Sequence, residues 1–168
     1  MIYLDYQATT PLAPEAREAM LAWLGGPESS GFGNPQSPHR LGRSAAAAIE
    51  IARDRVAALM PSGGRVIFTA SATEALNLAI RGSGAKRLAV LAMEHAAVLD
   101  TARAVDRNLA VLPVDPDGLL SSDTEIPAGV DLVAAMQVNN EIGTIQPVEE
   151  LAQKAHDAGA LFLCDAVQ

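Results

Sequence analysis

Residues 131–166 read DLVAAMQVNNEIGTIQPVEELAQKAHDAGALFLCDA, and this stretch decides the fold class. Its two ends, 131–138 and 160–166, are short apolar runs that are typical of strands buried on both faces. Residues 148–159, between them, are predicted as a helix. A strand, a helix and a second strand in this order are typical of a parallel sheet that helices cover.

The same alternation continues toward the N-terminus of the chain. The pattern predicts, in chain order, helix 14–24, loop 25–39, helix 41–60, strand 66–70, helix 73–81, strand 87–93, helix 97–108 and strand 109–114. We therefore expect an α/β fold with a mostly parallel sheet flanked by helices.

Composition excludes several classes of protein. With 168 residues the chain can bury a sizeable core, and its net charge of −8 argues against a nucleic-acid-binding surface. The apolar runs are too short to cross a membrane, and the N-terminal MIYLDYQATT lacks a secretory signal. Because Cys164 is the only cysteine, an internal disulfide is excluded and we expect a cytoplasmic protein. We assign no metal-ligating residues.

A candidate phosphate site follows the predicted strand 66–70. Ser71-Ala72-Thr73-Glu74 has the spacing of a capping box, so a helix should begin there. The unpaired N–H groups at such a helix start form a natural anion site. The alternative is that these residues only cap the helix.

Polar residues also end three further strands: His95, Asn140 and Asp165. Each has an ordinary alternative, namely a structural histidine, an asparagine turn, and an acid paired with an arginine or capping a helix. The C-terminal ends of parallel strands converge on one crevice, so these groups should surround one ligand. Pyridoxal phosphate fits, because it is a phosphorylated ring whose nitrogen an acid keeps protonated. Cys164 should point the opposite way and be a core residue.

Several segments in combination resemble the cysteine desulfurase family, which are pyridoxal-phosphate enzymes of the class V aminotransferase group. The similarity is collinear over essentially the whole chain and implies the aspartate aminotransferase-like fold (fold type I). The segments that carry it are YLDYQATTPL, GFGNPQSPHRLGR, IFTASATEALNLAI, EHAAVLD, VNNEIGTIQPVEEL and CDAVQ.

The resemblance also implies roles for single residues. Ala72 and Thr73 would hold the cofactor phosphate at a helix N-terminus. His95 would stack on the pyridine ring and act in proton transfer, as the one catalytic residue that we assign.

The remaining cofactor-binding residues come from the last two motifs of the resemblance. Asn140 would lie near the phenolic oxygen of the cofactor and near the substrate. Asp165 would pair with the ring nitrogen, and Gln168 would bond the phenolic oxygen.

The resemblance further implies that residues 1–13 contribute to the small domain and active-site wall. Residues 14–168 would form the N-terminal part of the large cofactor domain, which would be incomplete because the chain does not reach the Schiff-base lysine. Neither Lys86 nor Lys154 matches that lysine, and Cys164 does not match the sulfur-accepting cysteine of the family.

In the family, L-cysteine is converted to L-alanine. Its sulfur passes through an enzyme persulfide to an acceptor protein, for iron–sulfur cluster or thio-cofactor synthesis. We expect this chain to be inactive alone and to form a homodimer or to associate with a chain that supplies the C-terminal half. Two alternatives stay open: a non-catalytic partner protein, and a selenocysteine lyase or other class V enzyme.

Overall fold

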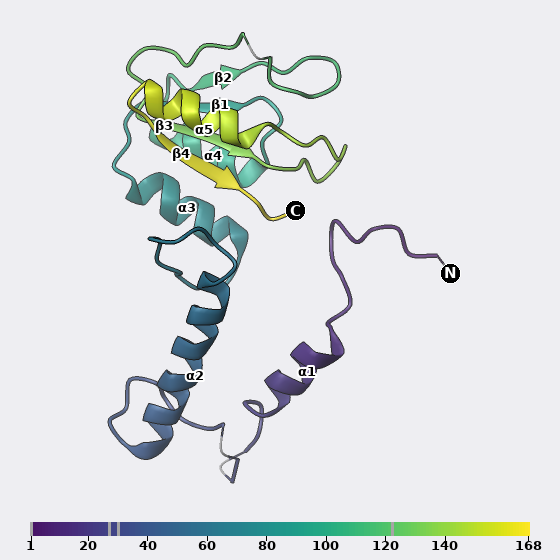
Figure 1. The fold of residues 1–168 in the computed structure, drawn as a ribbon, viewed down its shortest axis with the longest axis vertical. Coiled ribbons are helices and arrows are strands. Elements are labelled where there is room, and N and C mark those ends of the chain that lie inside the picture. Colours follow the sequence, from purple (N-terminus) through teal and green to yellow (C-terminus); the bar gives the residue numbers. More distant parts are fainter. Residues whose placement is uncertain (1, 27, 30, 122) are drawn as a thin grey trace. The chain divides into compact units, whose positions relative to one another are not determined.

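The computed structural model describes residues 2–26, 28, 29, 31–121 and 123–168. Two compact units follow one another along the chain, Met1–Phe68 and Thr69–Gln168 (Figure 1). Each unit is described by itself.

The second unit is built on a four-stranded sheet with the order β2-β1-β3-β4. The strands are β1 (Leu88–Leu91), β2 (Ala110–Leu112), β3 (Leu132–Met136) and β4 (Leu161–Asp165). All three pairs of neighbours are parallel. This direction follows from the connections, because α4 (Ala96–Val105) returns the chain from β1 to β2 and α5 (Val148–Asp157) returns it from β3 to β4. The predicted α/β fold is confirmed.

Helices cover both faces of this sheet (Figure 1). The side chains of β1 alternate between two core clusters, one on each face. Leu88 and Val90 of β1 belong to a core cluster that includes residues of α3 (Ala72–Gly82) and α4. Ala89 and Leu91, between and after them, belong to a second cluster with residues of α5. Burial on both faces explains why β1 and β3 are apolar at every position.

Side chains define where α3 and α4 begin. The Ser71 Oγ accepts the N–H of Glu74 at 3.2 Å, and the Glu74 carboxylate accepts the N–H of Ala70 at 2.7 Å. The predicted capping box is therefore confirmed, with the reciprocal bond one residue before its usual position. At α4 the cap is His95, whose Nδ1 accepts the N–H of Ala97 at 3.0 Å.

The first unit contains two helices, α1 (Pro14–Leu21) and α2 (Arg40–Ala57). Pro14 opens α1, where its missing N–H costs little. His39 caps α2, because its Nδ1 accepts the N–H of Gly42 at 3.2 Å. Both predicted helices are confirmed, each a few residues shorter at its C-terminal end.

The predicted strand at 66–70 is wrong. In the part of the chain that the structure describes, this segment pairs with no other strand, and Ile67 and Phe68 are 63% and 49% exposed. An apolar, β-branched run satisfies the side-chain pattern of a strand, but a strand also needs a neighbouring backbone to bond with. The sequence pattern contains no information about that neighbour.

The expectation that Cys164 is a core residue is also wrong. Cys164 is exposed on β4, whereas Asp165, the next residue, is buried. β4 pairs only with β3 among the described strands, so it lies at the edge of the sheet. An edge strand has less complete cover on its faces than a central strand, which the apolar composition of 160–166 could not reveal.

Candidate functional site

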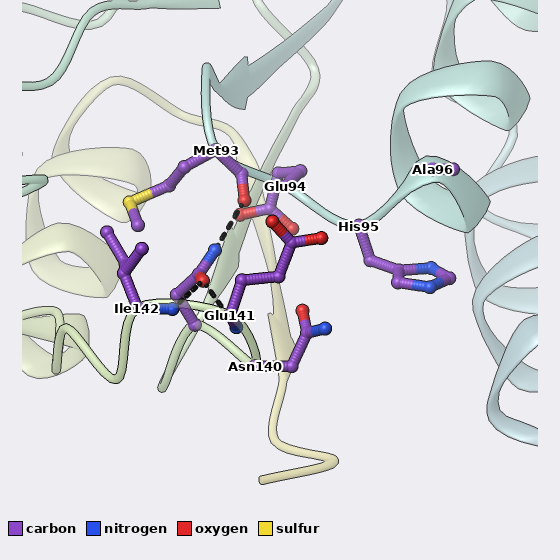
Figure 2. Close-up of a pocket in the computed structure, with 8 residues that line it drawn as sticks. Met93, Glu94, His95, Ala96, Asn140, Glu141 and Ile142 are labelled. Carbon is purple, nitrogen blue, oxygen red and sulfur yellow. Dashed lines mark hydrogen bonds between the residues drawn. The ribbon is translucent and has the colours of Figure 1, made fainter. Parts of the chain in front are cut away.

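A cavity of about 400 Å³ opens where β1 and β3 end. Four of its lining residues, Met93 to Ala96, follow β1, and the other four, Asn139 to Ile142, follow β3 (Figure 2). β1 and β3 are neighbours in the sheet, so their C-terminal ends present these residues together. The structure thus brings His95 and Asn140 to one site.

The loop after β3 is held by Asn139. Its Oδ1 accepts the N–H groups of Glu141 and Ile142 at 2.8 and 3.0 Å. Its Nδ2 donates to the backbone oxygen of Met93 at 3.0 Å, which ties the two halves of the cavity wall together (Figure 2). The asparagine-turn explanation therefore applies to Asn139, and Asn140 is the residue that this turn presents to the cavity.

A second set of bonds supports the same loop from the turn between β2 and β3. Gln146, which is 4% exposed, donates from Nε2 to the oxygen of Gly118 at 2.6 Å. Its Oε1 accepts the N–H of Leu120 at 3.1 Å. The Thr144 hydroxyl donates to the oxygen of Asp117 at 3.0 Å. These contacts fix the C-terminal end of the loop that carries Asn140, and Asn139 fixes its start.

The His95 ring has a defined orientation. Because Nδ1 accepts the N–H of Ala97, the proton of a neutral ring lies on Nε2. The cap thus joins two functions in one residue, since the ring that starts α4 also lines the cavity.

Asp165 lies at the end of β4, next to the strand that supports half of the cavity. It is 8% exposed, it is in register with Met136 of β3, and its Oδ1 accepts the N–H of Val167 at 3.1 Å. Among the described residues it forms no ion pair, so the pairing with an arginine is not found. It is placed beside the cavity but is not among the lining residues.

The remaining predicted residues lie outside the cavity wall as well. Ala72 and Thr73 open α3, where the first N–H groups of a helix have no intrahelical acceptor. Gln168 follows β4 with no helix or strand assignment. None of these three is among the described residues that line the cavity.

Glu94 is the residue that the sequence analysis missed. It is 6% exposed, and its Oε1 accepts the N–H of Met136 at 2.6 Å. Its Oε2 is buried and has no hydrogen-bond partner among the described residues. Burial, partly offset by the bond from Met136 and reinforced by the charge of Asp165, raises the pKa of Glu94 to about 7. The sequence did contain a signal for this residue, because Glu94 lies between the end of a predicted strand and the candidate site residue His95.

Comparison with known proteins places the whole chain in one family. A family model described as aminotransferase class-V matches residues 2–168. The chain is 41% identical to "Cysteine desulfurase IscS" of Rickettsia akari, over 99% of this chain and 43% of that protein. It is 42% identical to "Cysteine desulfurase" of Cereibacter sphaeroides, over 99% of this chain and 46% of that protein.

Solved structures agree with these sequence relatives. "SspA in complex with cysteine" superposes with a TM-score of 0.82 at 31% identity, over 98% of this chain and 50% of the other. DndA from Streptomyces lividans superposes with a TM-score of 0.74 at 31% identity, over 98% and 49%. The chain spans about half the length of the proteins that it matches.

Proposed function

Because the chain belongs to the class-V aminotransferase family, we propose that it forms the N-terminal half of the active site of a pyridoxal-phosphate-dependent cysteine desulfurase. The observation that carries the proposal is the cavity that His95 and Asn140 share at the ends of β1 and β3. The similarity to proteins named cysteine desulfurase supports the choice of reaction.

The donor set fits pyridoxal phosphate. The open N–H groups at the start of α3 suit a phosphate. A buried acid that has no ion pair among the described residues, Asp165, suits a protonated ring nitrogen. A cationic ring would supply the positive partner of this acid.

We assign the binding roles as follows. Ala72 and Thr73 hold the phosphate, Asp165 holds the ring nitrogen, and His95 covers the ring. When bound, pyridoxal phosphate supplies an electron sink for breaking bonds at the substrate carbon atoms.

Asn140 and Gln168 complete the proposed set by bonding the phenolic oxygen of the cofactor. Asn140 is held for this task by the Asn139 turn, which fixes its backbone through the N–H groups of Glu141 and Ile142. We assign proton transfer at the substrate side of the ring to His95, whose Nε2 is left available because Nδ1 accepts the N–H of Ala97.

The proposed substrate is L-cysteine, and the products are L-alanine and a sulfur atom carried to an acceptor protein. We place the reaction in the reducing cytoplasm, in a homodimer or in an assembly with a chain that supplies the C-terminal half. Cys164 is not proposed as the sulfur acceptor. Desolvation, followed by the charges of Asp165 and Glu94, raises the pKa of its thiol, so the nucleophilic thiolate is disfavoured.

A binding experiment tests the cofactor site first. We expect the 168-residue chain to bind pyridoxal phosphate saturably, as followed by the absorption of the cofactor and by calorimetric titration. Asp165→Asn should weaken binding about tenfold, which equals about 1.4 kcal/mol. Asp54→Asn, an exposed acid on α2, is the matched control and should bind like wild type.

An activity experiment then tests the reaction. The chain is mixed with a polypeptide that supplies the C-terminal half of a relative, and alanine formed from L-cysteine is measured. We expect the mixture to form alanine. We expect His95→Ala to abolish alanine formation. A complemented pair that binds the cofactor but releases no alanine would contradict the desulfurase assignment and leave the cofactor site standing.

A further inference from the structure

The carboxyl group of Glu94 completes the hydrogen bonding between β1 and β3. β1 ends at Leu91, whereas β3 continues to Met136. The N–H of Gln137 donates toward β4, to the oxygen of Asp165 at 2.8 Å, so the N–H of Met136 faces the β1 side. There Glu94 Oε1 accepts it at 2.6 Å, in the place that a backbone carbonyl would occupy in a longer β1.

The other oxygen of the same carboxyl group has no such partner. Glu94 Oε2 is buried and accepts no hydrogen bond within the described part of the chain. The ion pairs of the described residues join Arg53 to Glu50 and Arg103 to Asp100, and none includes Glu94. A buried carboxylate with one hydrogen bond and no cation is costly, whereas the neutral acid avoids the cost of the charge.

Among the titratable groups around Glu94, Asp165 increases the cost of its charged form. From β4, Asp165 raises the pKa of Glu94 through its negative charge, and the electrostatic influence of Glu94 extends to the Cys164 thiol. From the cavity wall, His95 and Glu141 are the other titratable neighbours (Figure 2). The negative charge of Asp165 therefore favours the protonated form of Glu94.

We propose that Glu94 is a positioning residue that links β1 to β3 as a neutral, protonated acid at mildly acidic pH, with its buried Oε2 uncharged. The link to the cofactor rests on the proposed function, in which Asp165 binds the ring nitrogen. A neutral Glu94 keeps the ends of β1 and β3 together through Met136 while it does not compete with Asp165 for the cationic ligand. A cation at Asp165 should in turn lower the proton affinity of Glu94, because binding linkage is reciprocal.

The direct test is a pH titration of the 168-residue chain by infrared difference spectroscopy, without cofactor. We expect wild type to retain one protonated carboxyl group that ionises with a midpoint near pH 7. Glu94→Gln should lack this carbonyl band. Glu141→Gln, which removes an exposed acid from the same cavity wall, is the matched control and should keep it. A band that persists in Glu94→Gln, or its complete loss by about pH 5.5 in wild type, would overturn the proposal.

Amide exchange at Met136 tests the positioning part separately. Glu94→Gln retains an Oε1 acceptor, so exchange should stay within about threefold of wild type, whereas Glu94→Ala should exchange at least about tenfold faster. If Glu94→Ala does not fold, the comparison of Glu94→Gln with wild type still decides. Fast exchange in Glu94→Gln, or equal protection in a folded Glu94→Ala, would refute the strand-linking role.

A third measurement adds pyridoxal phosphate to the infrared titration. We expect the midpoint of the Glu94 band to move to lower pH when the cofactor binds. Cofactor binding that leaves the midpoint of the Glu94 band unchanged would contradict the proposed link between Glu94 and the cofactor ring. If no cofactor binds, the proposed function fails, while the titration of the free chain still confirms or overturns the proton assignment.

Discussion

The two units of the chain differ in how they use their apolar side chains. In Thr69–Gln168, Leu88 and Leu91 are 1% and 0% exposed, because helices cover both faces of the sheet. In Met1–Phe68, Leu24 and Ile51 are 70% and 52% exposed, and α1 buries none of its residues. A similar supply of apolar residues therefore gives a core in one unit and an exposed surface in the other. Burial depends on neighbouring elements, and the composition of a segment does not determine it.

The largest expected effect tests this contrast directly. Leu88→Ala should lower the free energy of unfolding by about 2–5 kcal/mol, because it leaves a cavity between β1, α3 and α4. Leu24→Ala should change it by about 0.5 kcal/mol or less, since most of that side chain is already in water. Urea denaturation followed by circular dichroism measures both. Equal losses would show that the two units do not differ as the burial values indicate.

The pH dependence of stability sharpens the contrast within the sheet unit. Folding raises the pKa of Glu94 from 4.5 to about 7, so the folded state binds this proton more tightly than the unfolded state. Its stabilising contribution is present below pH 4.5 and is lost as pH rises to about 7. Over that window wild type should lose about 3 kcal/mol relative to Glu94→Gln. Urea midpoints measured at both ends of the window check this, and Glu141→Gln should follow the wild-type profile. If the free energy of unfolding changed with pH in the same way for wild type and Glu94→Gln, the raised pKa of Glu94 would be contradicted.

A smaller effect is expected at the turn that supports the Asn140 loop. Gly118 has a φ of +78°, and an added Cβ would lie 2.9 Å from Ile142 Cδ1 and 3.0 Å from Thr144 Oγ1. Gly118→Ala should therefore cost about 1–2 kcal/mol in thermal or urea unfolding. Gly82→Ala is the control, because an added Cβ meets nothing within 4 Å in α3, and it should stabilise by up to about 1 kcal/mol. If Gly118→Ala and Gly82→Ala changed the free energy of unfolding in the same direction, a side chain at position 118 would not strain the turn.

The smallest expected effect concerns the helix start at the proposed phosphate site. Ser71→Ala removes the acceptor for the N–H of Glu74 and should cost about 1 kcal/mol. Ser62→Ala, in an exposed turn of the first unit, should be neutral. Calorimetry of the two variants gives the comparison. A neutral Ser71→Ala would show that the Glu74 side chain alone holds this helix start.

Sequence patterns predicted the local elements well where one segment suffices to define them. The helix at α3 was predictable because Ser71 and Glu74 signal its start, and α5 because its apolar residues recur with helical spacing. The convergence of His95 and Asn140 was predictable too, since parallel strands end at one edge of a sheet. The segment 66–70 failed because its strand character depends on a partner backbone that the pattern cannot supply.

The sequence by itself determined the α/β alternation, the capping box at Ser71 and the polar residues His95, Asn140 and Asp165 that end strands, because each follows from a few residues close together in the chain. Tertiary structure alone decided that Glu94 meets Met136, that Cys164 lies exposed at an edge, and that the acid at position 94 has a pKa of about 7. These properties depend on groups that are more than forty residues apart in sequence or on the water that packing excludes. Burial and electric charge act through space, so only the folded arrangement specifies them.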